Sequence, residues 1–126
     1  MSEMWSETEA LAAELAAAEA RLAVLLPPVV SKGALNIKKD WAANASGNAH
    51  APYYPASITY DMDVRADAVE AEIGPDKDKK QGALGNILEF GTSKNPPHND
   101  GGRALAVEEP KFLAACEAVA EQALLG

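Results

Sequence analysis

The hydrophobic period of the sequence changes at Ile58 from helical spacing to strict alternation. Residues 58–64 and 69–73 each place apolar side chains at every second position. Such alternation predicts two half-buried strands. Because only a short link centred on residues 66–68 separates them, we expect an antiparallel hairpin with one apolar face. The other face is acidic and carries Asp61, Asp63, Glu70 and Glu72.

Two helices are expected before the hairpin. The first spans residues 7–26, where Ser6 is a suitable N-cap and leucines recur near one face. Pro27 and Pro28 should then break or kink it, since proline lacks the amide donor and restricts the residue before it. A second helix follows from Val30 through Trp41. Residues 46–48, Ser-Gly-Asn, should end it.

After the hairpin, the pattern predicts a short helix over residues 83–90 and a long Pro-rich loop over residues 92–102. Pro110 suits the first turn of a C-terminal helix. The apolar stripe of that helix consists of Phe112, Cys116, Val119 and Ala123. The expected fold is therefore α+β in a single domain of residues 1–126, divided into an N-terminal helix (1–28) and an α+β core (29–126).

Composition limits the core and the partners. Hydrophobic residues make up 48% of the 126 residues, but only 6% are aromatic, so the core should be thin and oligomerisation would help it. The net charge is −8. No stretch is basic enough to neutralise several phosphates, which argues against tight nucleic-acid binding. An acidic N-terminus and the lack of a long apolar run predict a soluble, intracellular protein.

Catalytic and metal-binding patterns are weak. His50 and His98 with Asp100 are a candidate metal site, but two exposed loop histidines are the favoured interpretation. The lone Cys116 cannot form an internal disulfide, and its place on an apolar stripe favours a buried thiol over a nucleophile. The acidic hairpin face is favoured as a solvated surface over a cation site. We therefore expect a protein that is not an enzyme and has no cofactor or metal.

Four other residues are candidates for contacts. Trp41 lies on a helix stripe, which favours a core position over an interface position. Tyr53 and Tyr54 lie in a Pro-flanked loop, where the core and interface interpretations are about equally favoured. Glu89 lies in an otherwise apolar turn, so its charge must face solvent or find a partner. If it finds a partner, the Glu89 carboxylate would bind a group on another element or another subunit. That group would be a backbone amide or an arginine such as Arg65 or Arg103.

The order of these parts resembles the small neck proteins of long-tailed bacteriophages, which are head–tail connector or tail-completion proteins. The resemblance covers about residues 29–126 and rests on the tryptophan-bearing helix, Ile58-Thr59-Tyr60-Asp61, Glu72-Ile73-Gly74-Pro75, Leu88-Glu89-Phe90-Gly91-Thr92, the Pro-rich loop and Pro110-Lys111-Phe112. The Glu-Phe-Gly-Thr segment followed by prolines is its most specific part. Members often carry an arginine-rich stretch before the first strand, whereas residues 44–55 contain no arginine.

This resemblance implies a structural subunit that forms a homo-oligomeric ring at the head–tail junction of the virion and seals the DNA channel. Six copies are expected from the symmetry of tails, with twelve as the alternative. Its partners would be head-completion or stopper, tail terminator and tail-tube proteins. Genomic DNA would pass through without sequence-specific binding, and no membrane would be involved. The candidate interface residues are Trp41, Tyr53, Tyr54, Glu89, Phe90, Gly91, Thr92, Pro96 and Pro97, and the candidate lumen-facing acids are Asp61, Asp63, Glu70 and Glu72.

Three other functions stay open at this point. A tail terminator, which caps the tail tube, has a similar size and α+β composition. A small metal-dependent enzyme would need His50, His98 and Asp100 to converge. A cytosolic interaction domain, such as a toxin–antitoxin partner, would need none of these features.

Overall fold

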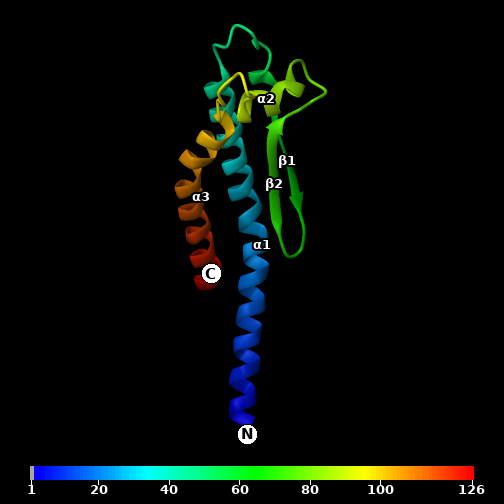
Figure 1. Cartoon of the computed structure of the whole chain (residues 1–126). Helices are drawn as coiled ribbons and strands as arrows, with labels where there is room; N and C mark the ends of the chain where they lie inside the picture. Colours follow the sequence, from blue (N-terminus) through cyan, green and yellow to red (C-terminus); the bar gives the residue numbers. More distant parts are fainter. Residues whose placement is uncertain (1) are drawn as a thin grey trace.

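The elements follow the expected α+β order, with one long helix before the hairpin. The computed structural model describes residues 2–126 and the side chains of residues 6–126. The elements are α1 (Ser2–Ala45), a 3-10 turn (Pro55–Ser57), β1 (Ile58–Val64), β2 (Val69–Pro75), a second 3-10 turn (Gly82–Leu84), α2 (Gly85–Phe90) and α3 (Asp100–Leu125). The α+β prediction is confirmed (Figure 1).

The predicted break at Pro27 and Pro28 is wrong. Helix α1 runs through both prolines for 44 residues, which corresponds to a length of about 66 Å. Two prolines remove backbone hydrogen bonds, but α3 packs along α1 on both sides of them and offsets that loss. On the N-terminal side, Arg21 Nε donates to Ala123 O at 2.7 Å. On the other side, buried Gly33 lets the Phe112 ring approach closely.

Helix α3 begins ten residues earlier than expected. It starts at Asp100, so Pro110 lies inside the helix and on its exposed surface, and the preceding loop is shorter than residues 92–102. The N-cap residue Asn99 makes no side-chain capping bond. The local sequence therefore carries no start signal, and the contact that caps this helix comes from α2.

The hairpin is antiparallel and has the predicted apolar and acidic faces. β1 and β2 are antiparallel, with Tyr60 opposite Ile73 and Met62 opposite Ala71. These apolar side chains pack toward α1 and are shielded more than the acids, which are exposed. The two strands are the only ones in the described chain, so both outer strand edges carry no further strand.

The main core lies at the C-terminal end of α1. Its buried residues are Ala45, Ala51, Tyr54 and Ile58, and the side chains of Trp41, Ala42, Ile73, Leu84 and Leu88 pack against them. Alanines make up half of the buried set, so the expectation of a thin core is confirmed. Burial of Ile58 and Tyr54 supplies most of the apolar area that this cluster removes from water.

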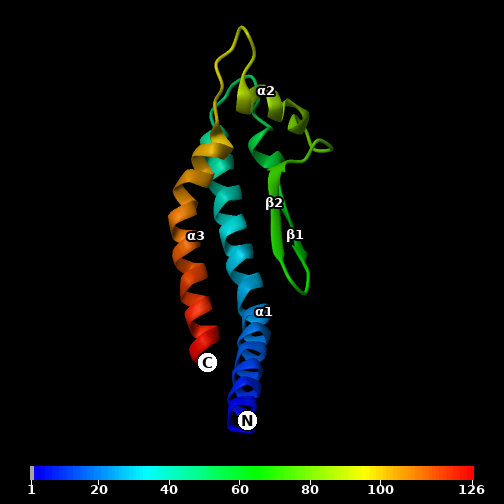
Figure 2. The same cartoon turned by 60° about the horizontal axis from the view of Figure 1, so that its bottom comes forward.

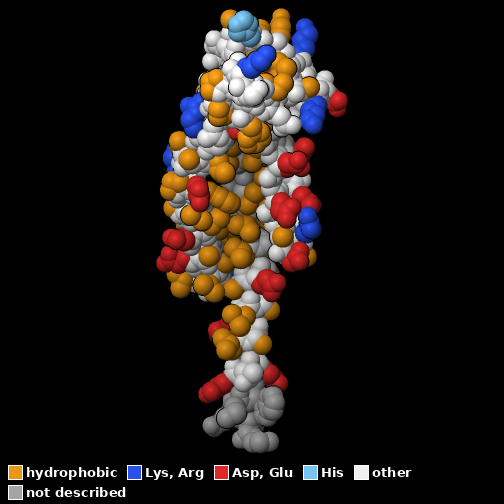
Figure 3. Space-filling model, viewed as in Figure 1, with side chains coloured by type: hydrophobic (Ala, Val, Ile, Leu, Met, Phe, Trp, Pro, Cys, Tyr) orange, Lys and Arg blue, Asp and Glu red, His pale blue; other side chains and the backbone are white. Residues whose placement is uncertain are grey.

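Helix α3 and the hairpin lie on opposite sides of α1, and the N-terminal half of α1 projects beyond both (Figures 1 and 2). Apolar side chains gather in a hollow between α3 and the hairpin (Figure 3). Within residues 2–126, no helix combines the length and apolar character needed to cross a membrane.

Candidate functional site

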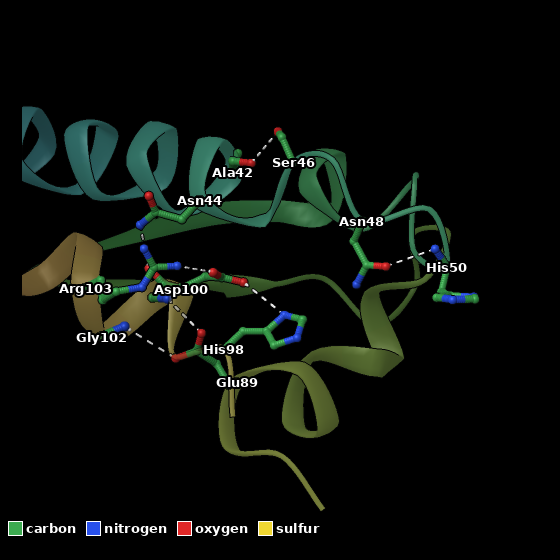
Figure 4. A network of polar contacts seen from close by, with 11 residues as sticks. Ala42, Asn44, Ser46, Asn48, His50, Glu89, His98, Asp100, Gly102 and Arg103 are labelled. Carbon is green, nitrogen blue, oxygen red and sulfur yellow. Dashed lines mark hydrogen bonds and ion pairs between the residues drawn. The ribbon is translucent and has the colours of Figure 1, made fainter. Parts of the chain in front are cut away.

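The Glu89 carboxylate caps the N-terminus of α3. Glu89 is 8% exposed. Its Oε1 accepts from Gly101 N at 2.7 Å and its Oε2 from Gly102 N at 3.4 Å (Figure 4). These amides would otherwise be unpaired at a helix start, and the positive end of the helix dipole favours the carboxylate. The predicted contact of Glu89 with another element is thus confirmed, and backbone amides rather than an arginine make it.

Asp100 holds the neighbouring side chains. It is 3% exposed and pairs with Arg103 Nη2 through Oδ1, while its Oδ2 lies 3.9 Å from His98 Nδ1 (Figure 4). Its carbonyl oxygen accepts from Asn44 Nδ2 at 3.0 Å, which joins α3 to α1. The cluster contains acids, a histidine and an arginine, but each acid is occupied by a helix start or an ion pair. The cluster therefore has a structural role, which is to hold α1, α2 and α3 together; we call it the clamp.

Two candidate interface residues, Tyr54 and Glu89, are corrected by their burial, and Trp41 has the core packing that its helix stripe favours. Tyr54 and Glu89 are buried within the domain, and Trp41 is packed against the core with its ring beside Gly101. They are therefore not available to a partner, because the domain uses them to join α1, α2 and α3. Burial, and to a lesser degree the charges of Glu89 and Asp100, raise the pKa of the Tyr54 hydroxyl.

The other candidate interface residues lie at the surface. Tyr53 is exposed, and the Lys80 ammonium lies 4.6 Å from its ring centroid. Phe90 is 73% exposed. Gly91 is partly buried with a φ of 74°, and a Cβ there would lie 2.6 Å from Asn95 O, so only glycine fits this turn. Thr92, Pro96 and Pro97 follow in the exposed loop.

The four hairpin acids form one exposed surface. Asp61 lies directly opposite Glu72, and Asp63 directly opposite Glu70. Like charges placed opposite each other repel. Arg65 relieves one pair, with its Nη2 at 2.8 Å from Asp63 and 3.3 Å from Glu70. The Asp61–Glu72 pair has no such ion pair among the described residues.

The alternative metal site is not assembled. His98 lies beside Asp100, but Figure 4 shows His50 well apart from that pair. No group of three potential ligands among the described residues is arranged to hold a metal ion. Burial raises the pKa of the Cys116 thiol, which disfavours the reactive thiolate.

A groove between α3 and β2 was missed from the sequence. It measures about 270 Å³ and is lined by apolar side chains of three elements and by Glu108, which is 4% exposed. The prediction that α3 starts at Pro110 placed Leu105 and Glu108 outside the helix. The four-residue spacing of Ala104, Glu108, Phe112 and Cys116 is the signal that would have extended the stripe.

Comparisons with protein-family models, curated proteins and solved structures found no match to this chain.

Proposed function

We propose that this chain is a structural, non-enzymatic subunit of a ring at the head–tail junction of a tailed bacteriophage. The resemblance of residues 29–126 to neck proteins suggests the particle. The observation that carries the assembly is a set of uncovered apolar side chains at well-separated places. These are Leu11 and Leu15 on the projecting half of α1, Ile87 and Phe90 on α2, and Leu105, Leu113 and Leu125 on α3.

Such surfaces suit repeated assembly. Monomeric proteins rarely expose large contiguous apolar patches, and apolar side chains gather in the hollow between α3 and the hairpin (Figure 3). Helix α2 lies at the end of the molecule opposite to the N-terminus of α1 (Figure 1). Contacts between different faces of identical subunits are heterologous, and they close into rings when the rotation between copies allows it.

The acidic hairpin face suits the wall of a DNA channel. Its carboxylates are exposed and would repel the phosphates of passing DNA, so the polymer would slide without binding. Among the described residues, no cation forms an ion pair with Asp61 or Glu72, so this part of the face has no basic side chain covering it.

Binding to phage parts tests the proposed function. Purified protein is mixed with tail tubes and, separately, with capsids that carry the portal-side ring, and co-sedimentation is measured. A connector binds the portal-side ring, a tail terminator binds the tail tube, and a protein that binds neither contradicts the proposal.

A separate variant tests whether the acidic hairpin face lines the DNA channel. The double substitution Asp61→Lys with Asp63→Lys should leave ring assembly intact and reduce DNA ejection, because cations in the lumen bind phosphate. The matched control is Glu117→Lys with Glu121→Lys on the exposed side of α3. Equal ejection by both variants would contradict a lumen-facing hairpin.

A further inference from the structure

The groove between α3 and β2 is an apolar surface that the chain itself leaves open. Val30, Ala34 and Ile37 of α1 form its floor, Ala71 and Ile73 of β2 one wall, and Leu113 of α3 contributes to the other. Figure 3 shows the same apolar hollow between α3 and the hairpin. Because water in such a groove gains few hydrogen bonds, an apolar side chain that displaces it gains free energy.

The Glu108 carboxylate lies in the groove wall and forms no ion pair among the described residues, although Lys32 and Lys111 line an adjoining pocket with it. Glu108 Oε1 accepts from Asn36 Nδ2 at 3.0 Å, but the buried Oε2 has no hydrogen-bond partner among the described residues. A buried carboxylate without a paired cation is costly. The neighbouring Glu109 lines the same groove and is exposed. The occupant that suits this groove is therefore apolar and carries a positive charge.

The chain carries such a group at its far end. Ile87 and Phe90 of α2 are 49% and 73% exposed. Lys94 follows in the exposed loop and has no ion pair among the described residues. Thr92 Oγ1 accepts from the backbone amides of Lys94 and Asn95 at 3.2 and 3.1 Å, which orders the turn that carries the lysine. We call Ile87, Phe90 and Lys94 the α2 knob.

We propose that the α2 knob of one copy docks in the α3–β2 groove of a second copy. Phe90 would fill the apolar groove, and Lys94 would face Glu108 and Glu109. Helix α2, which carries Ile87 and Phe90, lies beyond the end of the hairpin (Figure 1), whereas the groove is lined by residues of β2 and α3, so every copy presents both surfaces at different places. The contact is thus head to tail. It rests on the proposed function, for which it supplies the repeating contact of the ring.

Single variants and their mixture test this contact. Phe90→Ser removes the knob, and Leu113→Glu adds a charge to the groove; both positions are exposed, so the fold should persist. Val64→Ser and Val107→Glu are controls at exposed positions outside both surfaces. Circular dichroism and urea unfolding verify the fold of each variant, and sedimentation velocity over a range of concentrations measures association.

The wild-type protein and both controls should associate as concentration rises, and each test variant should weaken association about tenfold or more. An equimolar mixture of Phe90→Ser and Leu113→Glu should form a heterodimer that does not grow, since one intact knob meets one intact groove. A wild type that stays monomeric at about 1 mM overturns the proposal. A mixture that forms no heterodimer overturns it as well.

Charge reversal tests the role of Lys94. Lys94→Glu should weaken association, and combining it in one chain with Glu109→Lys should restore it, because both positions are exposed and their charges exchange. Lack of restoration removes Lys94 from the contact. A ring that assembles through the knob but binds no phage part contradicts only the proposed function. A particle-bound ring that is unaffected by Phe90→Ser contradicts only the knob and groove.

Discussion

Residues 6–17 of α1 project from the domain with every side chain exposed, whereas residues 18–45 lie against α3 and the hairpin. The projecting half holds five alanines, two leucines and three glutamates among its twelve residues. These residues favour helix without any neighbour. The packed half contains Pro27, Pro28, Val30 and Gly33, which disfavour helix.

The comparison shows two sources of stability within one helix. Composition maintains the projecting half, and tertiary packing maintains the other half against its composition. Gly33 shows how packing offsets a low helix propensity. Its missing side chain weakens the helix but allows Phe112 to pack closely. The projecting half also leaves Leu11 and Leu15 exposed to solvent.

The largest difference in the free energy of unfolding should come from truncating one apolar side chain in the packed core and one on the projecting half of α1. Ile58→Ala, at a core position 1% exposed, should lower the free energy of unfolding by about 2–5 kcal/mol because it leaves a cavity. Leu11→Ala on the projecting half should change it by less than about 0.5 kcal/mol. Urea unfolding of both variants measures the difference, and equal losses would remove the distinction between the regions.

The clamp that positions α3 on the packed half is the next target. Glu89→Gln should lower the free energy of unfolding by about 1–2 kcal/mol, because the helix start loses its charged acceptor. Glu121→Gln on the exposed side of α3 is the control. If the two variants unfold alike, the carboxylate of Glu89 does not stabilise the start of α3.

Proline replacement tests whether packing really opposes composition. Pro28→Ala should raise the free energy of unfolding by about 1 kcal/mol, since an exposed interior proline is replaced by the best helix former. The gain is smaller than the intrinsic difference because proline also restricts the unfolded chain. Urea unfolding checks the sign, and a loss would mean that the ring of Pro28 contributes packing of its own.

The smallest effect concerns the buried tyrosine and depends on pH. Burial raises the pKa of Tyr54 above its ordinary value of 10.0, so its contribution to stability is complete below pH 10.0 and is lost as pH rises toward the folded-state pKa. Tyr54→Phe should therefore reduce the alkaline loss of stability. At neutral pH the change should stay below about 1 kcal/mol, because the hydroxyl makes no hydrogen bond of standard geometry among the described residues. Unfolding at about pH 7 and about pH 11 measures both.

Local patterns predicted the hairpin and the end of α1 before residues 46–48, but neither the continuity of α1 through its two prolines nor the start of α3. The alternation over residues 58–64 matches β1. Successive side chains of a strand point to opposite faces of the sheet, so the local pattern alone is enough to predict the strand. Pro27, Pro28 and Pro110 misled the prediction, since the neighbours that offset a proline are distant in sequence. The start of α3 was missed for the same reason, because its cap comes from Glu89, twelve residues before Gly101.

The candidate site was predicted in part. Phe90 and the hairpin acids were identified as surface residues, and they are exposed. Tyr54 was included as an interface residue because it lies in a Pro-flanked loop, and Glu89 because a charge in an apolar turn needs solvent or a partner, whereas the fold buries both. The groove around Glu108 could not be predicted, because it exists only where three elements meet.

Amide hydrogen exchange along α1 tests the two-part helix most directly. The Phe90→Ser variant is used at a concentration where sedimentation velocity shows a monomer, so that association does not add protection. The account predicts fast exchange over residues 6–17 and slow exchange over residues 29–45, despite the better helix formers in the first segment. Equal protection of the two segments, or faster exchange in residues 29–45, would contradict it.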